Sequence, residues 1–149
     1  MKLSPDQVTA VVLAGGHGTR VRHLLPDLPK PMAPVNGKPF LEWVVRYLAK
    51  QGIRRAVLST GFLAETIEHH FHAQPVKAAT VRCVPETKPL GTAGGFLNAV
   101  RATAEKSPAW LVLNGDSLAL APLDEMFRAL AAPGIEGAVL GLPVPESKP

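Results

Sequence analysis

The run VTAVVLA, residues 8–14, constrains the fold of this chain more than any other segment. It is almost continuously apolar and rich in β-branched residues, a pattern typical of a parallel strand buried on both faces. The run stops at Gly15, where a glycine-rich turn begins. A strand of this kind belongs in the interior of a sheet, and the loop at its carboxyl end is a common place for a ligand.

Strand and helix patterns alternate along the rest of the chain. Pro39 suits the first turn of a helix, Gly52 suits its end, and the apolar residues between them recur at helical spacing. After the first strand and a long loop to Gly37, we predict helices at residues 39–52, 63–71, 92–105 and 123–132, and strands at residues 56–59, 80–84, 110–114 and 137–142.

This alternation predicts an α/β fold. Right-handed crossovers between successive strands give a mostly parallel sheet with helices on both faces. Ligands of such sheets bind outside the carboxyl ends of the strands, so the site is expected in the loops after Ala14, Ser59, Pro85 and Asn114. With 149 residues, 46% of them hydrophobic, the chain is long enough and apolar enough for one domain with a buried core.

Cysteine usage and hydropathy narrow the class of protein. The single cysteine, Cys83, has no partner for an intramolecular disulfide, and we interpret it as a core residue. No apolar run approaches the roughly 18 residues of a membrane span, and the N-terminal segment lacks the apolar core of a signal peptide. We therefore expect no membrane partner and a cytoplasmic location.

Positive charge is concentrated in the first part of the chain. Residues 1–60 carry nine lysines and arginines against three acids, whereas residues 61–149 carry seven against nine. The cations are scattered among prolines and apolar residues, without the interleaved aromatics of a nucleic-acid surface. This distribution favours a small anionic ligand and argues against nucleic acid.

The loop LAGGHGTRVRHLLPDLPKPM begins at the end of the first strand and has the composition of a phosphate site. Gly15, Gly16 and Gly18 allow positive φ and let backbone N–H groups approach a ligand. Arg20 offers a bidentate fork to phosphate oxygens, and Lys30 presents its ammonium between two stiffening prolines. The loop is neither a Walker loop nor a dinucleotide fingerprint, and a plain turn with solvated cations is the alternative.

Two later loops carry further polar groups. Gly91 and Thr92 begin a predicted helix whose N-terminal amides would face a ligand, and Glu86 could accept hydrogen bonds from a base edge. The alternative is an ordinary helix start with Thr92 as the N-cap. Asp116 follows the strand WLVL, where a carboxylate beside phosphates suits Mg²⁺, although Asn-Gly-Asp is also a common turn.

Five other titratable residues are left out of the predicted site. His69, His70 and His72 fan around their helix at this spacing, so we interpret them as solvated or partly packed rather than as metal ligands. Asp124 and Glu125 begin a predicted helix, where the helix dipole favours negative charge.

Four motifs, LAGGHGTRVRHLLPDLPKPM, GKPFLEW, ETKPLGTAGG and LNGDS, resemble in order and spacing those of the sugar-phosphate nucleotidyltransferases. The resemblance implies a Rossmann-like sheet of the nucleotide-diphospho-sugar transferase type. It also implies Mg²⁺-dependent transfer of a nucleotidyl group from a nucleoside triphosphate to a sugar 1-phosphate, with release of pyrophosphate. By this resemblance Arg20 and Lys30 are the catalytic cations, Asp116 is the first metal ligand, and the nucleotide is bound by Leu13, Ala14, Gly15, Gly16, Gly18, Thr19, Glu86, Gly91 and Thr92.

Within this family, the segments DLPKPMAPVNGKPFLEW and YLAKQGIRRAVLSTGF are most similar to D-glycero-α-D-manno-heptose 1-phosphate guanylyltransferases, which serve cell-surface glycan synthesis. This similarity favours GTP and a heptose 1-phosphate as substrates. Mannose 1-phosphate guanylyltransferases and N-acetylmuramate 1-phosphate uridylyltransferases share much of the pattern, and uracil N3–H could also donate to Glu86.

Family members are longer than this chain. The resemblance therefore implies that residues 1–149 form the nucleotide-binding part of a truncated domain, and that much of the sugar-phosphate pocket and a second metal-binding aspartate are missing. A non-catalytic nucleotide-binding or assembly module remains the alternative from another class. An open sheet edge would also allow a homo-oligomer.

Overall fold

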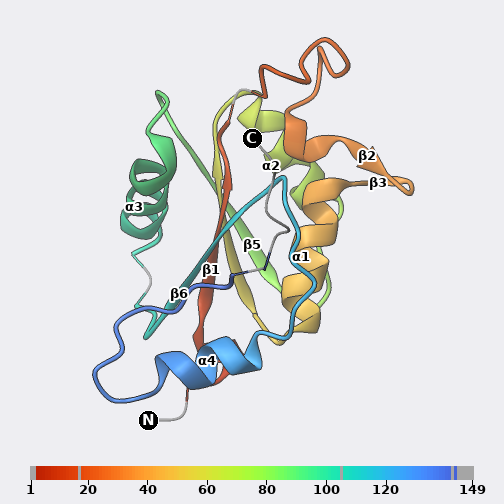
Figure 1. Cartoon of the computed structure of the whole chain (residues 1–149). Coiled ribbons are helices and arrows are strands. Elements are labelled where there is room, and N and C mark those ends of the chain that lie inside the picture. Colours follow the sequence, from red (N-terminus) through yellow and green to blue (C-terminus); the bar gives the residue numbers. More distant parts are fainter. Residues whose placement is uncertain (1–2, 17, 105, 142, 144–149) are drawn as a thin grey trace.

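The computed structural model describes residues 3–16, 18–104, 106–141 and 143. Its core is a four-stranded sheet with helices on both faces, accompanied by a separate two-stranded hairpin (Figure 1). The elements in chain order are η1 (Pro5–Gln7), β1 (Thr9–Ala14), η2 (Lys30–Met32), β2 (Pro34–Val35), β3 (Lys38–Pro39), α1 (Phe40–Lys50), β4 (Arg55–Thr60), α2 (Ala64–Ala73), β5 (Thr80–Pro85), α3 (Gly91–Thr103), β6 (Trp110–Asn114) and α4 (Asp124–Leu130).

All pairings in the four-stranded sheet are parallel, and the strand order is β5-β4-β1-β6. Val11 of β1 stands in register with Val57 of β4 on one side and Val112 of β6 on the other. Val11 and Val12 are fully buried, as the continuous apolar run predicts for an interior strand. The predicted parallel α/β fold is therefore confirmed, with β1 in the interior of the sheet.

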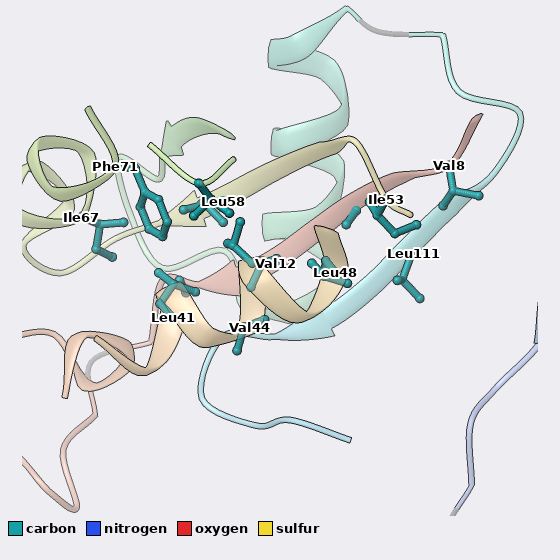
Figure 2. Close-up of a cluster of buried hydrophobic side chains, with 14 of the residues drawn as sticks. Val8, Val12, Leu41, Val44, Leu48, Ile53, Leu58, Ile67, Phe71 and Leu111 are labelled. Atoms are coloured by element: carbon teal, nitrogen blue, oxygen red, sulfur yellow. The ribbon is translucent and has the colours of Figure 1, made fainter. Parts of the chain in front are cut away.

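The two faces of the sheet are covered by different helices. Figure 1 shows α1 and α2 against one face and α3 against the other. Val12 points into the larger core, where it meets α1 and α2, whereas Val11 belongs to a smaller cluster with Ala99 of α3. The labelled side chains of the larger core come from the sheet and from helices α1 and α2 (Figure 2). Successive residues of one strand thus serve opposite cores.

Helix α1 follows the pattern predicted for it. Leu41, Val44, Val45 and Leu48 recur at helical spacing and are buried against the sheet. Beyond the helix, the N–H of Ile53 donates to the carbonyl of Leu48 at 3.0 Å and that of Gly52 donates to Ala49 at 3.1 Å, while Gly52 has φ +90°. These two bonds and the left-handed glycine form a Schellman motif, which explains why the helix ends before Gly52.

The long loop between β1 and α1 contains a 3-10 helix and a hairpin that were not predicted. Its residues 30–39 form η2 and the hairpin of β2 and β3, in which Val35 pairs with Lys38. Asn36 and Gly37 both have positive φ, the geometry of a two-residue type I′ turn. The Asn-Gly pair was the available sequence signature for this hairpin.

One predicted strand is wrong within the part of the chain that the structure describes. Residues 137–141 form no strand, and residue 142 lies outside the described part. Val139 is 94% exposed, although its neighbourhood, Gly137 to Gly141, is apolar enough to suit a strand. A strand is stable only when a neighbour satisfies its backbone groups, and this segment pairs with none of the four strands in the sheet.

The environment of Cys83 and the character of the helices can be compared with what the composition predicts. Cys83 lies partly buried against the larger core, and burial, with the nearby charge of Glu68, raises the pKa of its thiol to about 11. This agrees with the interpretation of Cys83 as a packing residue. Within the described ranges, none of the helices combines the length and apolar character that crossing a membrane requires.

Candidate functional site

A cavity of about 440 Å³ lies at the carboxyl ends of the parallel strands. Its walls come from the loops after β1, β5 and β6, from η2 and from the start of α3. All twelve residues that the sequence places in the site line this cavity, together with four others. The lining residues are Leu13, Ala14, Gly15, Gly16, Gly18, Thr19, Arg20, Val21, Lys30, Pro31, Glu86, Pro89, Gly91, Thr92, Asn114 and Asp116.

Lys30 and Asp116, which are 86 positions apart in the chain, meet in this cavity. The Lys30 Nζ lies 2.6 Å from an oxygen of the Asp116 carboxylate. Lys30 is held in η2, which is anchored by the buried side chains of Pro31 and Met32, and Asp116 follows β6. The hydrogen bond from Lys30 holds the pKa of Asp116 below its ordinary value, against the opposing effect of partial burial.

This ion pair matters for geometry more than for stability. The side chains of Lys30 and Asp116 are 41% and 33% exposed, respectively. Pairs that are this exposed contribute no more than about 1 kcal/mol to folding. The pair therefore keeps a cation and a carboxylate side by side at the cavity wall, and each group is still accessible to a ligand.

Arg20 lines the same cavity and is exposed. Within the described residues it forms no ion pair, so its guanidinium is available to an anion. Arg22, two residues further along, stacks over the ring of Phe62 at 4.6 Å from the ring centroid. This cation–π contact fastens the glycine-rich loop to the loop after β4, and it therefore helps to place Arg20.

The three glycines of the first loop serve different purposes. Only Gly18 has positive φ, at +57°, so the predicted use of left-handed conformations applies to one of them. A Cβ on Gly15 would lie 2.6 Å from Oε1 of Glu86, whereas a Cβ on Gly16 would meet nothing within 4 Å. A side chain at Gly15 would therefore force the Glu86 carboxylate to shift from this position.

Glu86 is held on both of its carboxylate oxygens. Oε1 accepts a hydrogen bond from the Ser59 hydroxyl at 2.9 Å, and Oε2 accepts one from the backbone N–H of Leu90 at 3.1 Å. The backbone N–H of Glu86 donates to the Thr60 carbonyl at 2.7 Å, which extends the β4–β5 pairing by one step. The carboxylate thus has one orientation, at the edge of the cavity.

Helix α3 begins at the cavity. Its N-cap is Leu90, so the alternative reading of Thr92 as the N-cap is wrong, and Gly91 enters the helix with φ +69°. Gly91 and Thr92 line the cavity in the first turn of this 13-residue helix. The free amides and positive end of the helix dipole there favour an anion or an electron-rich ligand atom.

Asp116 is the one carboxylate of the cavity that suits a hard cation. In the described part of the chain, no three histidine, cysteine, aspartate or glutamate side chains gather into a metal cluster. Mg²⁺ usually takes only one or two carboxylates and completes its shell with water and substrate phosphates. A single Asp116 at the cavity wall therefore fits Mg²⁺ that arrives with a nucleotide, but does not make a self-sufficient metal site.

The three histidines of α2 agree with the interpretation that excluded them. His69 and His72 are exposed, and His70 is partly packed, with its Nε2 2.9 Å from Oε2 of Glu42. Glu42 itself is only 1% exposed and also contacts Lys38 and Arg46. This buried carboxylate, which the sequence analysis did not single out, joins α1, α2 and the hairpin.

Ser59 and Asn114 are the polar residues that the sequence analysis did not assign to the site. Asn114 is the last residue of β6 and Ser59 is the last but one of β4, and each strand runs into a loop of the expected site. The only sequence signal that these two residues belong to the site is a polar side chain near the carboxyl end of a buried strand. Nothing local to Ser59 predicts that its hydroxyl meets Glu86, 27 residues away.

The fold and the cavity define a parallel α/β protein with a pocket at the carboxyl ends of its strands, and comparisons with known proteins specify its family. A model of the nucleotidyl transferase family matches residues 9–149, so the chain belongs to that family. It is 42% identical over 119 residues to the D-glycero-alpha-D-manno-heptose 1-phosphate guanylyltransferase of Aneurinibacillus thermoaerophilus, covering 80% of this chain and 50% of that protein. It is 37% identical to the mannose-1-phosphate guanylyltransferase of Mycobacterium tuberculosis, covering 83% of this chain and 34% of that protein.

Solved structures show the same relationship. HddC from Yersinia pseudotuberculosis, crystallised in complex with GMP-PN, is 34% identical and superposes with a TM-score of 0.71, covering 83% of this chain and 54% of that one. A UDP-glucose pyrophosphorylase from Acinetobacter baumanii, 23% identical, shares the fold with a TM-score of 0.63. The chain spans about half the length of the Aneurinibacillus thermoaerophilus protein and of HddC.

Proposed function

We propose that this chain forms the nucleotide-binding part of a guanylyltransferase that transfers GMP from GTP to D-glycero-α-D-manno-heptose 1-phosphate and releases pyrophosphate. One observation carries the proposal: a single cavity brings together two cations, Arg20 and Lys30, a candidate metal ligand, Asp116, and a base-reading carboxylate, Glu86. The names of two relatives that are 42% and 40% identical support the heptose and the guanylyl group.

The reaction needs no protein nucleophile. An oxygen of the sugar 1-phosphate forms a bond to the α-phosphorus of GTP, while the bond from that phosphorus to the bridging oxygen of pyrophosphate breaks. The attacking phosphate has a second pKa of about 6, so it is already ionised at neutral pH without a general base. The main barrier is the approach of two polyanions.

Arg20 and Lys30 address that barrier. Their cationic side chains line the cavity, Arg20 from within the first loop and Lys30 from η2 at its end. Positioned there, they neutralise phosphate oxygens, align the attacking and leaving groups, and stabilise the charge that grows on pyrophosphate. Lys30 now donates to Asp116, and a phosphate oxygen can replace that carboxylate as its partner.

Mg²⁺ fits the donor chemistry of Asp116, and it would be held there by this carboxylate together with the nucleotide phosphates. The chemistry that the ion supplies when bound is neutralisation of the triphosphate. Because Asp116 keeps its pKa below the ordinary value, its carboxylate is ionised at neutral pH and ready to coordinate.

The carboxylate of Glu86 supports guanine as the base of the nucleotide. The two oxygens of its carboxylate can accept from guanine N1–H and N2–H₂, which are adjacent donors, whereas uracil offers the single donor N3–H. A carboxylate held at the edge of the cavity therefore gains more from guanine than from uracil.

Mannose 1-phosphate is the second candidate acceptor, because a mannose-1-phosphate guanylyltransferase is 37% identical to this chain. The cavity concerns the nucleotide and does not distinguish the two sugars.

We place either activity in the cytoplasm, where nucleotide-activated sugars for cell-surface glycans are made. Among the described residues β6 lies at one edge of the sheet, and a homo-oligomer formed at this edge would appear as a doubled hydrodynamic mass.

The test combines binding with turnover. The chain is incubated with Mg²⁺, each of GTP, UTP, CTP, ATP and dTTP, and each of the two sugar 1-phosphates, and pyrophosphate release is measured. We expect release with GTP and the heptose 1-phosphate. Measurable GTP binding without release from any pair would instead indicate a non-catalytic nucleotide-binding module, and absence of GTP binding would contradict the site itself.

A further inference from the structure

We infer that Ser59 is a positioning residue for base selection: its buried hydroxyl orients the Glu86 carboxylate so that the site distinguishes guanine from bases with fewer donors. This inference rests on the proposed guanylyl function and deepens it. It assigns a role to a residue of β4 that lies behind the cavity wall and is fully buried.

Ser59 has one proton to donate and two acceptors within reach. Its Oγ lies 2.9 Å from Oε1 of Glu86 and 3.2 Å from the carbonyl oxygen of Gly95. A hydroxyl donates to one partner at a time, and a carboxylate is the stronger acceptor because it is charged. The shorter contact is therefore the working hydrogen bond, directed from the end of β4 to the loop before α3.

Two glycines leave open the space that Oε1 of Glu86 occupies. A Cβ built on Gly15 would lie 2.6 Å from Oε1, and one built on Gly95 would lie 2.7 Å from the same oxygen. Oε1 thus occupies a slot between two glycines, from the first loop and from α3. The Leu90 N–H donates to Oε2 at 3.1 Å and fixes the rotation of the group.

This arrangement prepares the carboxylate before a base arrives. Each carboxylate oxygen has a second acceptor position after its protein hydrogen bond is made. Guanine can donate both N1–H and N2–H₂ to an oriented carboxylate, hypoxanthine can donate only N1–H, and adenine presents an acceptor at N1. Loss of the orienting hydroxyl should therefore weaken guanine binding most, because preorganisation is what holds both acceptors in place.

The variants are Ser59→Ala, which deletes the donor, and Ser59→Cys, which keeps a weak donor of similar size. The matched control is Thr103→Ala, which deletes another buried hydroxyl, one bonded to the carbonyls of Ala99 and Val100 at the far end of α3. Dissociation constants for GTP, inosine triphosphate and UTP are measured by calorimetry on the 149-residue chain, and thermal melting checks the fold.

We expect Ser59→Ala to weaken GTP binding by about tenfold and to lower the ratio of GTP to inosine triphosphate affinity, as suits loss of a hydrogen bond to a charged group. The GTP affinity of Ser59→Cys should lie between those of the wild type and Ser59→Ala. Thr103→Ala should bind GTP as tightly as the wild type does. In a Glu86→Gln background, Ser59→Ala should cause little further loss of GTP affinity, because the two residues act through one contact.

Two results would overturn the role of Ser59 while leaving guanylyl transfer intact: unchanged GTP affinity and selectivity in both Ser59 variants, or an equal loss for all three nucleotides. An additive loss in the Glu86→Gln background would also overturn it. A wild-type chain that binds GTP no better than UTP would instead refute the proposed function.

Discussion

Lys30 and Asp116 are 86 positions apart in the chain, yet the ammonium of one lies 2.6 Å from the carboxylate of the other. η2 brings Lys30 to the end of β6, where Asp116 follows the strand. In the proposed reaction Lys30 binds phosphate and Asp116 holds Mg²⁺, and the ion pair shows that both groups reach the same wall of the cavity.

Replacing Lys30 by alanine should lower pyrophosphate release by roughly 100-fold or more, as loss of a preorganised electrostatic donor does. Stability should fall by less than about 1 kcal/mol, because the Lys30–Asp116 pair is exposed. The pKa of Asp116 should rise towards its ordinary value once the donor is gone. Turnover, urea unfolding and a carboxyl NMR titration check these three outcomes.

The matched control for Lys30 is Lys50→Ala, at the exposed end of α1 and away from the cavity. It should leave turnover and the Asp116 titration unchanged. Equal turnover in Lys30→Ala and Lys50→Ala would remove Lys30 from the reaction.

Arg20→Ala should lower turnover strongly while the fold stays intact. The guanidinium lines the cavity and, among the described residues, forms no ion pair that the substitution would break. Its loss should therefore reduce phosphate binding and transition-state stabilisation without affecting stability. Arg101→Ala, an exposed arginine in the last turn of α3, serves as the control in the same assay. A turnover indistinguishable from that of the control would exclude Arg20 from the mechanism.

Gly15→Ala should weaken GTP binding by about tenfold with a small change in stability. The added Cβ would lie 2.6 Å from Oε1 of Glu86, so that oxygen must shift, and we expect the shift to disturb its hydrogen bond with the Ser59 hydroxyl. Gly137→Ala, where a Cβ meets nothing within 4 Å, is the control. In a Glu86→Ala background the same substitution at Gly15 should cost little, and calorimetric titration with GTP measures both effects.

Glu42→Gln should lower the free energy of unfolding by about 2 kcal/mol at pH 7, since charged hydrogen bonds to a buried carboxylate are lost. Burial alone would raise the pKa of Glu42, but hydrogen bonds from Arg46, Lys38 and His70 outweigh burial and lower it. The control is Asp124→Asn, which removes an exposed ion pair with Arg128 and should change stability by no more than about 0.5 kcal/mol.

The lowered pKa of Glu42 also sets the direction of a pH effect. Its stabilising contribution is complete above the ordinary glutamate pKa of about 4.3 and is lost as pH falls through the lower folded value. Wild type and Glu42→Gln should therefore converge in stability as pH falls below about 4. Urea unfolding between pH 7 and pH 3.5 measures the difference, and a gap that stays constant with pH would contradict this linkage.

Much of the fold could be predicted because its determinants are local. The apolar run of β1, the helical spacing of Leu41 to Leu48 and the stop at Gly52 each act within a few residues. The failed strand at residues 137–141 shows the limit of this reasoning, since apolar composition permits a strand but only a paired neighbour forms one. The hairpin of β2 and β3 has a local signature in Asn36-Gly37, although no hairpin was predicted there.

The sequence by itself determined the elements, the loops at which a site would form and the chemical kinds of group in it, because periodicity, turn residues and motif order are properties of short segments. The tertiary structure alone decided which groups touch: Lys30 with Asp116, Ser59 with Glu86, and Glu42 with two cations and a histidine. These contacts join residues that parallel crossovers bring to one edge or one core of the sheet. Their distances depend on strand order and packing, which no short segment encodes.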